Sequence, residues 1–206
     1  MKKKVEISEL EEPEEIKVIL IGDSETGKTN LINISVGLEF SEYTTPLTKP
    51  TYKPKMFEIE GKKYILNLWD TEGREKYVNI TKIFFKGSEI IILVYDITMI
   101  ESFNSLKKWH QMCEDIIETD HIYGLVGNKS DLFLNEQVST EDVKSFAESI
   151  KTKYKIVSAK IDRNSFVEFL EELVKDYIKL NLKNMRKSIK LIKDKSTKKS
   201  KCMGCN

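Results

Sequence analysis

The sequence has few of the residues that would place it outside the reducing interior of a cell. It contains only three cysteines in 206 residues, and Cys113 stands alone inside a segment with helical spacing. Three cysteines do not form a disulfide framework, so we expect the chain to fold in a reducing cytosol. No apolar run is long enough to cross a bilayer, and residues 1–15 lack the apolar centre of a signal peptide.

Net charge is also nearly absent, because two unlike parts of the chain cancel. The total is +1, yet residues 183–206 hold nine basic side chains and one acidic, which makes that segment +8 and the remainder −7. A basic tail on an acidic body indicates an anionic membrane or another acidic partner for the tail. We expect no nucleic-acid partner.

One stretch combines a predicted strand with a phosphate-binding pattern. Residues 16–21 are mostly apolar and predict a buried strand, and Gly22, Gly27, Lys28 and Thr29 then fit G-x-x-x-x-G-K-[ST]. In such a loop, backbone N–H groups and the N-terminus of the next helix surround a phosphate. A chance glycine turn is the alternative, but the strand before and a predicted helix over residues 30–36 favour phosphate binding.

The chemistry of this P-loop assigns roles to its residues. Lys28 would contact the outer phosphates and so serve catalysis, and the Thr29 hydroxyl would bind Mg²⁺. The predicted nucleotide-binding residues of the loop are Ser24, Glu25, Thr26, Gly27, Lys28, Thr29 and Asn30.

The rest of the chain alternates between strand and helix patterns. Further strands are predicted over residues 55–60, 62–69, 89–95, 121–127 and 154–157. Helices are predicted over residues 75–86 and 100–118. A third helix should begin at an N-cap at Ser139, with Asp142 three residues later, and a fourth should run from an N-cap at Asn164 to about residue 180. Residues 38–54 include three prolines, Pro46, Pro50 and Pro54, and predict a loop.

This order predicts an α/β fold with a six-stranded, mostly parallel sheet and helices on both faces. The two strands around Gly61 read as a hairpin that adds one antiparallel edge strand. We divide the chain into a flexible extension over residues 1–15, one domain over 16–180 and a basic tail over 181–206.

A second motif selects the base. Asn128, Lys129 and Asp131 form N-K-x-D directly after the predicted strand over 121–127. The Asp131 carboxylate can accept from both N1–H and the exocyclic amino group of guanine, a donor pair that adenine lacks. The stem of Lys129 can lie over the base. Because ligands bind at the carboxyl ends of parallel strands, these residues, the P-loop and Asp70 predict one nucleotide pocket.

Together these motifs resemble those of the Ras superfamily of small GTPases over residues 16–180, and the segments 65–69, 84–87, 93–98 and 102–103 resemble the Rab family. The resemblance implies the P-loop NTPase fold of a Ras-like G domain, GTP and GDP as ligands, Mg²⁺, and GTP hydrolysis. It implies guanine recognition by Ser158, Ala159 and Lys160 and ring packing by Phe40. It further implies a magnesium role for Asp70 and a γ-phosphate contact from the N–H of Gly73.

The resemblance also implies partners. Tyr52, Trp69 and Phe84 fall where Rab proteins keep an aromatic triad that contacts effectors, although ordinary core packing is an equally good interpretation. The other implied partners are an exchange factor, a GTPase-activating protein, a GDP-dissociation inhibitor and a prenylation escort.

Several positions depart from the family pattern. Arg74 takes the catalytic place of a glutamine that positions water, and because guanidinium only donates hydrogen bonds, we expect slow intrinsic hydrolysis. Leu47 falls in the magnesium-binding threonine slot, so Thr48 could bind the metal only after a one-residue shift. Glu72 replaces an alanine. Glu25 replaces Gly or Ala, and its carboxylate would repel phosphate unless it turned to solvent.

The tail carries Cys202 and Cys205 near its end, without a C-a-a-X box. Rab tails are usually geranylgeranylated on such cysteines, so the resemblance implies lipidation here. Half of a zinc site is the alternative, but no second cysteine pair exists to complete it. A lipid plus a polybasic stretch would hold the chain on the cytoplasmic face of an endomembrane, cycling with the cytosol.

Two functions follow from these features. One is a Rab-type GTP/GDP switch that regulates vesicle traffic with slow intrinsic hydrolysis, since Rab-directed activating proteins supply both an arginine and a glutamine. The other is a binding-only pseudo-GTPase that recruits partners while GTP-bound, which Leu47, Glu72 and Arg74 favour. An ATP-using P-loop kinase would leave the N-K-x-D motif unexplained.

Overall fold

The computed structural model describes residues 12–43, 51–71 and 84–201, with side chains as far as residue 188. One sheet contains six strands in the order β2-β3-β1-β4-β5-β6. The strands are β1 (Glu14–Ile21), β2 (Thr51–Ile59), β3 (Lys62–Asp70), β4 (Ile90–Asp96), β5 (Ile122–Asn128) and β6 (Lys153–Ile156). Only the β2–β3 pair is antiparallel among the strand pairs of the described ranges, which confirms the predicted sheet.

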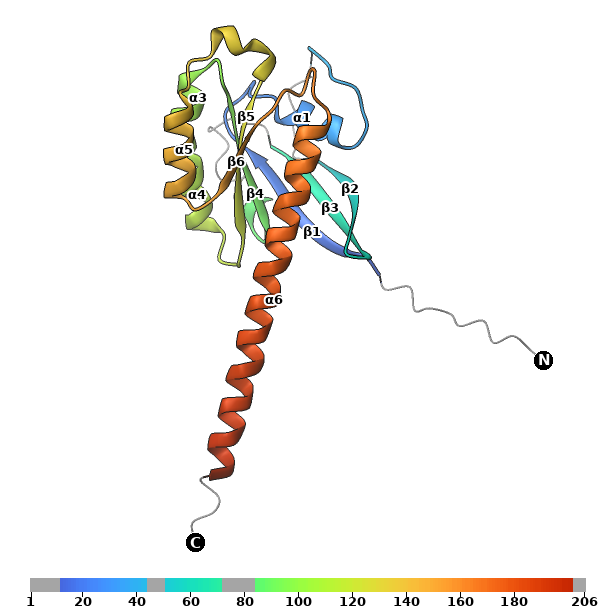
Figure 1. Ribbon diagram of the computed structural model, residues 1–206, viewed down its shortest axis with the longest axis vertical. Coiled ribbons are helices and arrows are strands. Elements are labelled where there is room, and N and C mark those ends of the chain that lie inside the picture. The colour runs from blue at the N-terminus through green and yellow to red at the C-terminus, as the bar shows by residue number, and fades with distance from the viewer. Residues whose placement is uncertain (1–11, 44–50, 72–83, 202–206) are drawn as a thin grey trace, which may run out of the picture.

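Helices cover both faces of this sheet (Figure 1). One face packs against α1 (Lys28–Ser35) and α6 (Asn164–Lys201), and the other packs against α3 (Ile100–Asn104), α4 (Leu106–Ile116) and α5 (Thr140–Ser149). The side chains of the central strand β4 alternate between these two cores, with Ile90 and Ile92 on the first and Ile91 and Leu93 on the second. Every residue of β4 is buried, as its continuous apolar run predicts.

Two strands extend further than the sequence indicates. The loop prediction is wrong for residues 51–54, because they belong to β2 and place Thr51 opposite Asp70. Pro54 is tolerated there because β2 is an edge strand, where a missing N–H need not interrupt the ladder. The flexible extension is wrong at its last residues, since Glu14 lies in β1 and pairs with Lys62 at 2.7 Å. β4 and β5 begin and end one residue later than the strands predicted over 89–95 and 121–127. β6 begins and ends one residue earlier than the strand predicted over 154–157.

The middle helices differ from prediction mainly in their ends. Ser139 caps α5 as predicted, because its hydroxyl accepts from the Asp142 N–H at 3.1 Å. The helix predicted over residues 100–118 divides into α3 and α4 at Ser105 and ends at Ile116. The helix predicted over residues 75–86 lies almost wholly outside the described residues, and a short 3-10 helix, η2 (Ser130–Asn135), follows β5.

The last helix is longer than predicted. We expect its end near residue 180, but α6 continues to Lys201 and runs well past the end of the sheet (Figure 1). No glycine or proline occurs between Asn164 and Lys201, so nothing in the local sequence stops the helix. Asn164 is not the cap, because the Asp162 carboxylate accepts from the N–H groups of Asn164 and Ser165, each at 3.1 Å. None of the helices in the described ranges is long and apolar enough to cross a bilayer.

Candidate nucleotide-binding site

The P-loop leaves the carboxyl end of β1 in a conformation that needs its glycines. Gly22 and Gly27 have φ angles of 147° and 91°. A Cβ on Gly22 would lie 2.0 Å from the carbonyl oxygen of Val94, so only glycine lets the loop pass this close to β4. Glu25 also has a positive φ of 67°, and it is exposed at the tip of the loop.

Lys28 lies folded under this loop. Its side chain is buried, and its ammonium donates to the carbonyl oxygens of Gly22 at 2.9 Å and Asp23 at 2.7 Å. Burial lowers the pKa of Lys28 to about 8, while the Asp70 and Asp23 carboxylates act in the opposite direction. The loop therefore holds a desolvated ammonium group, a donor that suits phosphate oxygens, hydrogen-bonded to two backbone carbonyl oxygens.

Asp70 and Thr29 face each other where β3 ends. The Thr29 hydroxyl hydrogen-bonds to the Asp70 carboxylate, whose pKa is raised by burial and partly lowered again by Thr29 and Lys28. Asp70 Oδ1 is buried without a hydrogen-bond partner among the residues that the structure describes. An unsatisfied carboxylate oxygen beside a hydroxyl is a donor set that suits a hard, oxygen-preferring cation such as Mg²⁺.

Asn128 connects the P-loop to the opposite wall of the site. Its amide nitrogen donates to the carbonyl oxygen of Thr26 at 2.9 Å, and its amide oxygen accepts from the N–H of Ala159 at 3.1 Å. The side chain is only 2% exposed, so both hydrogen bonds lie away from water. Three segments that are distant in the sequence are thereby held in one place.

The other two members of N-K-x-D are also positioned by hydrogen bonds. Lys129, in a left-handed conformation with φ 68°, extends its ammonium to Asp96 Oδ2 at 2.6 Å. Asp131 accepts from the Ser158 hydroxyl at 2.5 Å. The structure therefore brings the predicted guanine residues of the β5 and β6 loops together at one edge of the sheet.

Phe40 and Asn30 belong to the side of the site formed by α1 and the segment after it. The Asn30 amide hydrogen-bonds the backbone of Ser41 in both directions, at 2.9 and 3.1 Å. Lys160 lies with its ammonium 5.9 Å from the Phe40 ring centroid and pairs with Glu42 at 2.9 Å. The hydrogen bond to Glu42 raises the pKa of Lys160. These contacts join the segment after α1 to the loop after β6.

Several residues of the site were not predicted. Asp96 ends β4 and pairs with Lys129, and Asp23 receives a hydrogen bond from Trp109 Nε1 at 2.7 Å. Glu42 was missed as the partner of Lys160. Asp96 carries a detectable signal, since a carboxylate directly after a fully buried strand lies at the ligand-binding edge of a parallel sheet. The Trp109 contact has no such signal, because the two residues are 86 positions apart.

Tyr52, Trp69 and Phe84 form one aromatic cluster. Ring centroids lie 4.9 Å apart for Tyr52 and Trp69, and 5.8 Å apart for Trp69 and Phe84. Trp69 packs against the core on the α3–α5 face, whereas Tyr52 is 53% exposed. The cluster combines core packing at one end with an accessible ring at the other.

The remaining predicted site residues lie outside the described residues. They are Thr48, Gly73 and Arg74, with the departures Leu47 and Glu72, and the tail cysteines Cys202 and Cys205.

Comparison with known proteins agrees with this geometry. Residues 17–179 match the model of the Ras family. Rab-11C of Dictyostelium discoideum is 35% identical over 160 residues, which cover 78% of this chain and 71% of the relative. RabC of the same organism is 34% identical over 172 residues, 82% of this chain and 87% of the relative. Rab-12 of Mus musculus is 35% identical over 165 residues, 80% of this chain and 68% of the relative. The chain therefore belongs to the Ras family and is a Rab-like small GTPase with a Ras-like G domain.

Proposed function

We propose that this protein is a GTP/GDP switch of membrane traffic whose intrinsic hydrolysis is slow. The observation that carries the proposal is the position of Asn128, which joins the P-loop at Thr26 to the guanine-reading loop at Ala159. This link supports binding of one nucleotide by the phosphate and base motifs together. No ATP-using alternative accounts for it, because Asp131 would then be a carboxylate without its two donors.

Mg²⁺ would be held by Thr29 and Asp70, and by Thr48 if the segment after α1 brings it near. The ion would supply charge neutralisation for the β- and γ-phosphates. Lys28 would contribute a second positive charge from beneath the loop, where burial keeps water from competing for it.

Replacement of Asp131 tests the guanine assignment. We expect Asp131→Asn to weaken GDP binding by about 100-fold and to move preference toward xanthosine diphosphate, because xanthine presents a carbonyl where guanine has an amino group. Affinities for fluorescent guanosine, xanthosine and adenosine diphosphates would be measured by titration. Asp115→Asn, on the exposed side of α4, is the matched control. Unchanged guanine preference in the Asp131 variant would refute the assignment.

Hydrolysis separates the switch from the binding-only alternative. Arg74 follows the Asp70-Thr71-Glu72-Gly73 segment, where the water-orienting residue belongs. We expect Arg74→Gln to raise the intrinsic single-turnover rate about tenfold, or ~1.4 kcal/mol of barrier, because orientation of water outweighs the added charge. The same assay on a variant with Leu47→Thr and Glu72→Ala added tests whether those positions mask the gain.

The outcomes of this assay are distinct. A parent that hydrolyses GTP slowly alone and faster with a Rab-directed activating protein supports the switch. No hydrolysis under either condition supports the binding-only module. A parent as fast as ordinary small GTPases contradicts the slow-hydrolysis proposal.

The remaining features complete a Rab-type cycle. Lipids on Cys202 and Cys205 would anchor the basic tail to an anionic endomembrane, and an escort and a GDP-dissociation inhibitor would return the chain to the cytosol. Exchange and activating factors would change the nucleotide, and Tyr52, Trp69 and Phe84 would contact effectors. The accessible Tyr52 ring supports this last role.

A further inference from the structure

The part of α6 that follows Tyr177, residues 178–201 and here called the α6 extension, carries an apolar stripe. Tyr177 is the last buried residue in the part of the helix whose side chains are described, yet Ile178, Leu182 and Met185 follow it, with spacings of four and three between them. Leu182 is 48% exposed and Met185 is 60% exposed. Residues at these spacings share one face of a helix, so the stripe extends past the domain that would otherwise cover it.

The stripe does not stop with the described side chains. In the sequence the same spacing continues through Ile189 and Ile192, and the backbone is helical to Lys201. A helix that only connected a domain to an anchor would need no such pattern. The pattern indicates a surface that the extension binds.

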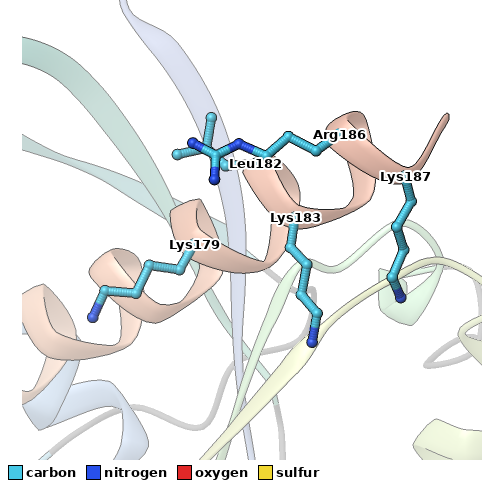
Figure 2. Close-up of a pocket in the computed structure, with 5 residues that line it drawn as sticks. All are labelled: Lys179, Leu182, Lys183, Arg186 and Lys187. Carbon is cyan, nitrogen blue, oxygen red and sulfur yellow. The ribbon is translucent and has the colours of Figure 1, made fainter. Parts of the chain in front are cut away.

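Basic residues lie beside the stripe. Lys179, Lys183, Arg186 and Lys187 line, with Leu182, a surface hollow of about 570 Å³ (Figure 2). Figure 2 shows Arg186 extending back toward Leu182, while the ends of the three lysines project from the helix. Lys179 lies 3.5 Å from Asp176, and the other three have no carboxylate partner among the residues that the structure describes. Three cations are therefore available to an external anion.

One hydrogen bond fixes which face is free. Asn184 donates to Asp120 at 2.7 Å, which turns that side of the helix toward the domain. Arg186 is two residues further and so lies about 200° around the helix axis, on the opposite face. Leu182 is two residues before Asn184 and lies at the same angle in the other direction, so Leu182 and Arg186 both point away from the domain.

We propose that the α6 extension binds an anionic bilayer surface directly, as an amphipathic helix. Leu182 and Met185 enter the boundary between headgroups and acyl chains, and Lys183, Arg186 and Lys187 contact lipid phosphates. This inference rests on the membrane role proposed above and adds a contact that does not depend on prenylation. It also holds the domain close to the membrane, because Leu182 follows the buried Tyr177 by only five residues.

Charge selects the membrane over a second copy of the chain. Residues 177–193 contain no acidic side chain, so two extensions side by side would have no carboxylates to offset their lysines and arginines. Residues 179–201 hold ten basic side chains and one acidic. An anionic lipid surface complements that charge along its whole length.

The test uses the full chain made in bacteria, which carries no prenyl group, with its nucleotide bound. We expect it to co-sediment with phosphatidylcholine vesicles that contain phosphatidylserine, but not with phosphatidylcholine alone, and to release as salt rises. Leu182→Gln with Met185→Gln should weaken binding about tenfold. Lys183→Gln with Arg186→Gln and Lys187→Gln should weaken it about 100-fold. The matched control, Lys107→Gln with Lys108→Gln and Lys144→Gln, removes the same charge from α4 and α5. It should bind the anionic vesicles more tightly than the variant with Lys183, Arg186 and Lys187 replaced.

Two results would overturn the inference. If the Leu182 and Met185 variant binds like the parent, the apolar stripe does not enter the bilayer. If the parent ignores anionic vesicles and instead sediments as a dimer that this variant dissociates, the stripe is an interface between copies. GDP affinity is measured on every preparation, because its loss would count against the proposed switch rather than against the membrane contact.

Discussion

Among single residues, Asn128 shows how one side chain organises a site. Its amide has one donor directed at the P-loop and one acceptor directed at the loop after β6, and both are used. Gly27 is part of the same arrangement, since a Cβ at this position would meet Asn128 Nδ2 at 2.2 Å. The glycine is therefore needed for its size as well as for its φ of 91°.

Two glycines allow these effects to be separated. Gly37 has a φ of 88° but nothing within 4 Å of an added Cβ. We expect Gly27→Ala to weaken GDP binding at least about tenfold and to cost about 1–3 kcal/mol of stability, because it displaces Asn128 as well as straining the backbone. Gly37→Ala should cost about 1 kcal/mol from strain alone and leave affinity unchanged.

Fluorescent GDP titration and thermal unfolding of both variants provide the measurement. Equal losses of affinity in the two variants would show that backbone strain alone accounts for the effect and that the contact with Asn128 does not matter.

Among helices and strands, the ends are decided by side chains within a few residues. Ser139 starts α5 through one hydrogen bond to the N–H of Asp142, and Asp162 starts α6 through two. Toward the C-terminal end of α6 no glycine or proline occurs before Lys201, so no local signal stops the helix. Local signals that stop a helix matter as much as those that start one.

The cap of α5 can be tested in isolation. Ser139→Ala should lower the free energy of unfolding by about 1 kcal/mol, because the N–H of Asp142 loses its acceptor. The expected fall in Tm is about 2–4 °C for a chain of this size. Ser149→Ala, at the last residue of the same helix, should change Tm by less. If the Ser139→Ala variant has the same Tm as the parent, water replaces the hydroxyl without loss of stability.

In the whole molecule, the nucleotide site and the proposed membrane contact lie at opposite ends of the sheet. The P-loop and the loops after β5 and β6 lie at the carboxyl ends of the parallel strands. α6 leaves the domain at the opposite ends of these strands (Figure 1). Nucleotide exchange can then proceed without releasing the membrane, and the two activities should be separable by mutation.

Replacement of the tail cysteines tests this separation in cells. We expect Cys202→Ser with Cys205→Ser to move the protein from membranes to the soluble fraction, because the α6 extension alone binds reversibly whereas two anchoring signals hold. GDP binding by the purified variant should match the parent. Fractionation followed by immunoblotting measures the distribution. A variant that stays on membranes would place the main anchor elsewhere in the chain.

Contiguous patterns account for most of what could be predicted. The P-loop, the N-K-x-D motif, the buried run of β4 and the cap at Ser139 are each contained in a few neighbouring residues, where backbone sterics and periodicity act. The strand–helix alternation then leaves few possible sheets, because parallel connections have one handedness. These features were enough to predict the fold and the main nucleotide motifs.

Other features depend on which segments the sheet brings together. The pairing of Lys129 with Asp96, the contact of Trp109 with Asp23 and the two hydrogen bonds of Asn128 join residues between 31 and 102 positions apart. The extension of β2 over residues 51–54 likewise depends on pairing with β3, since the local sequence there favours a loop. Such contacts are set by strand order and packing, and no short stretch of sequence contains both partners.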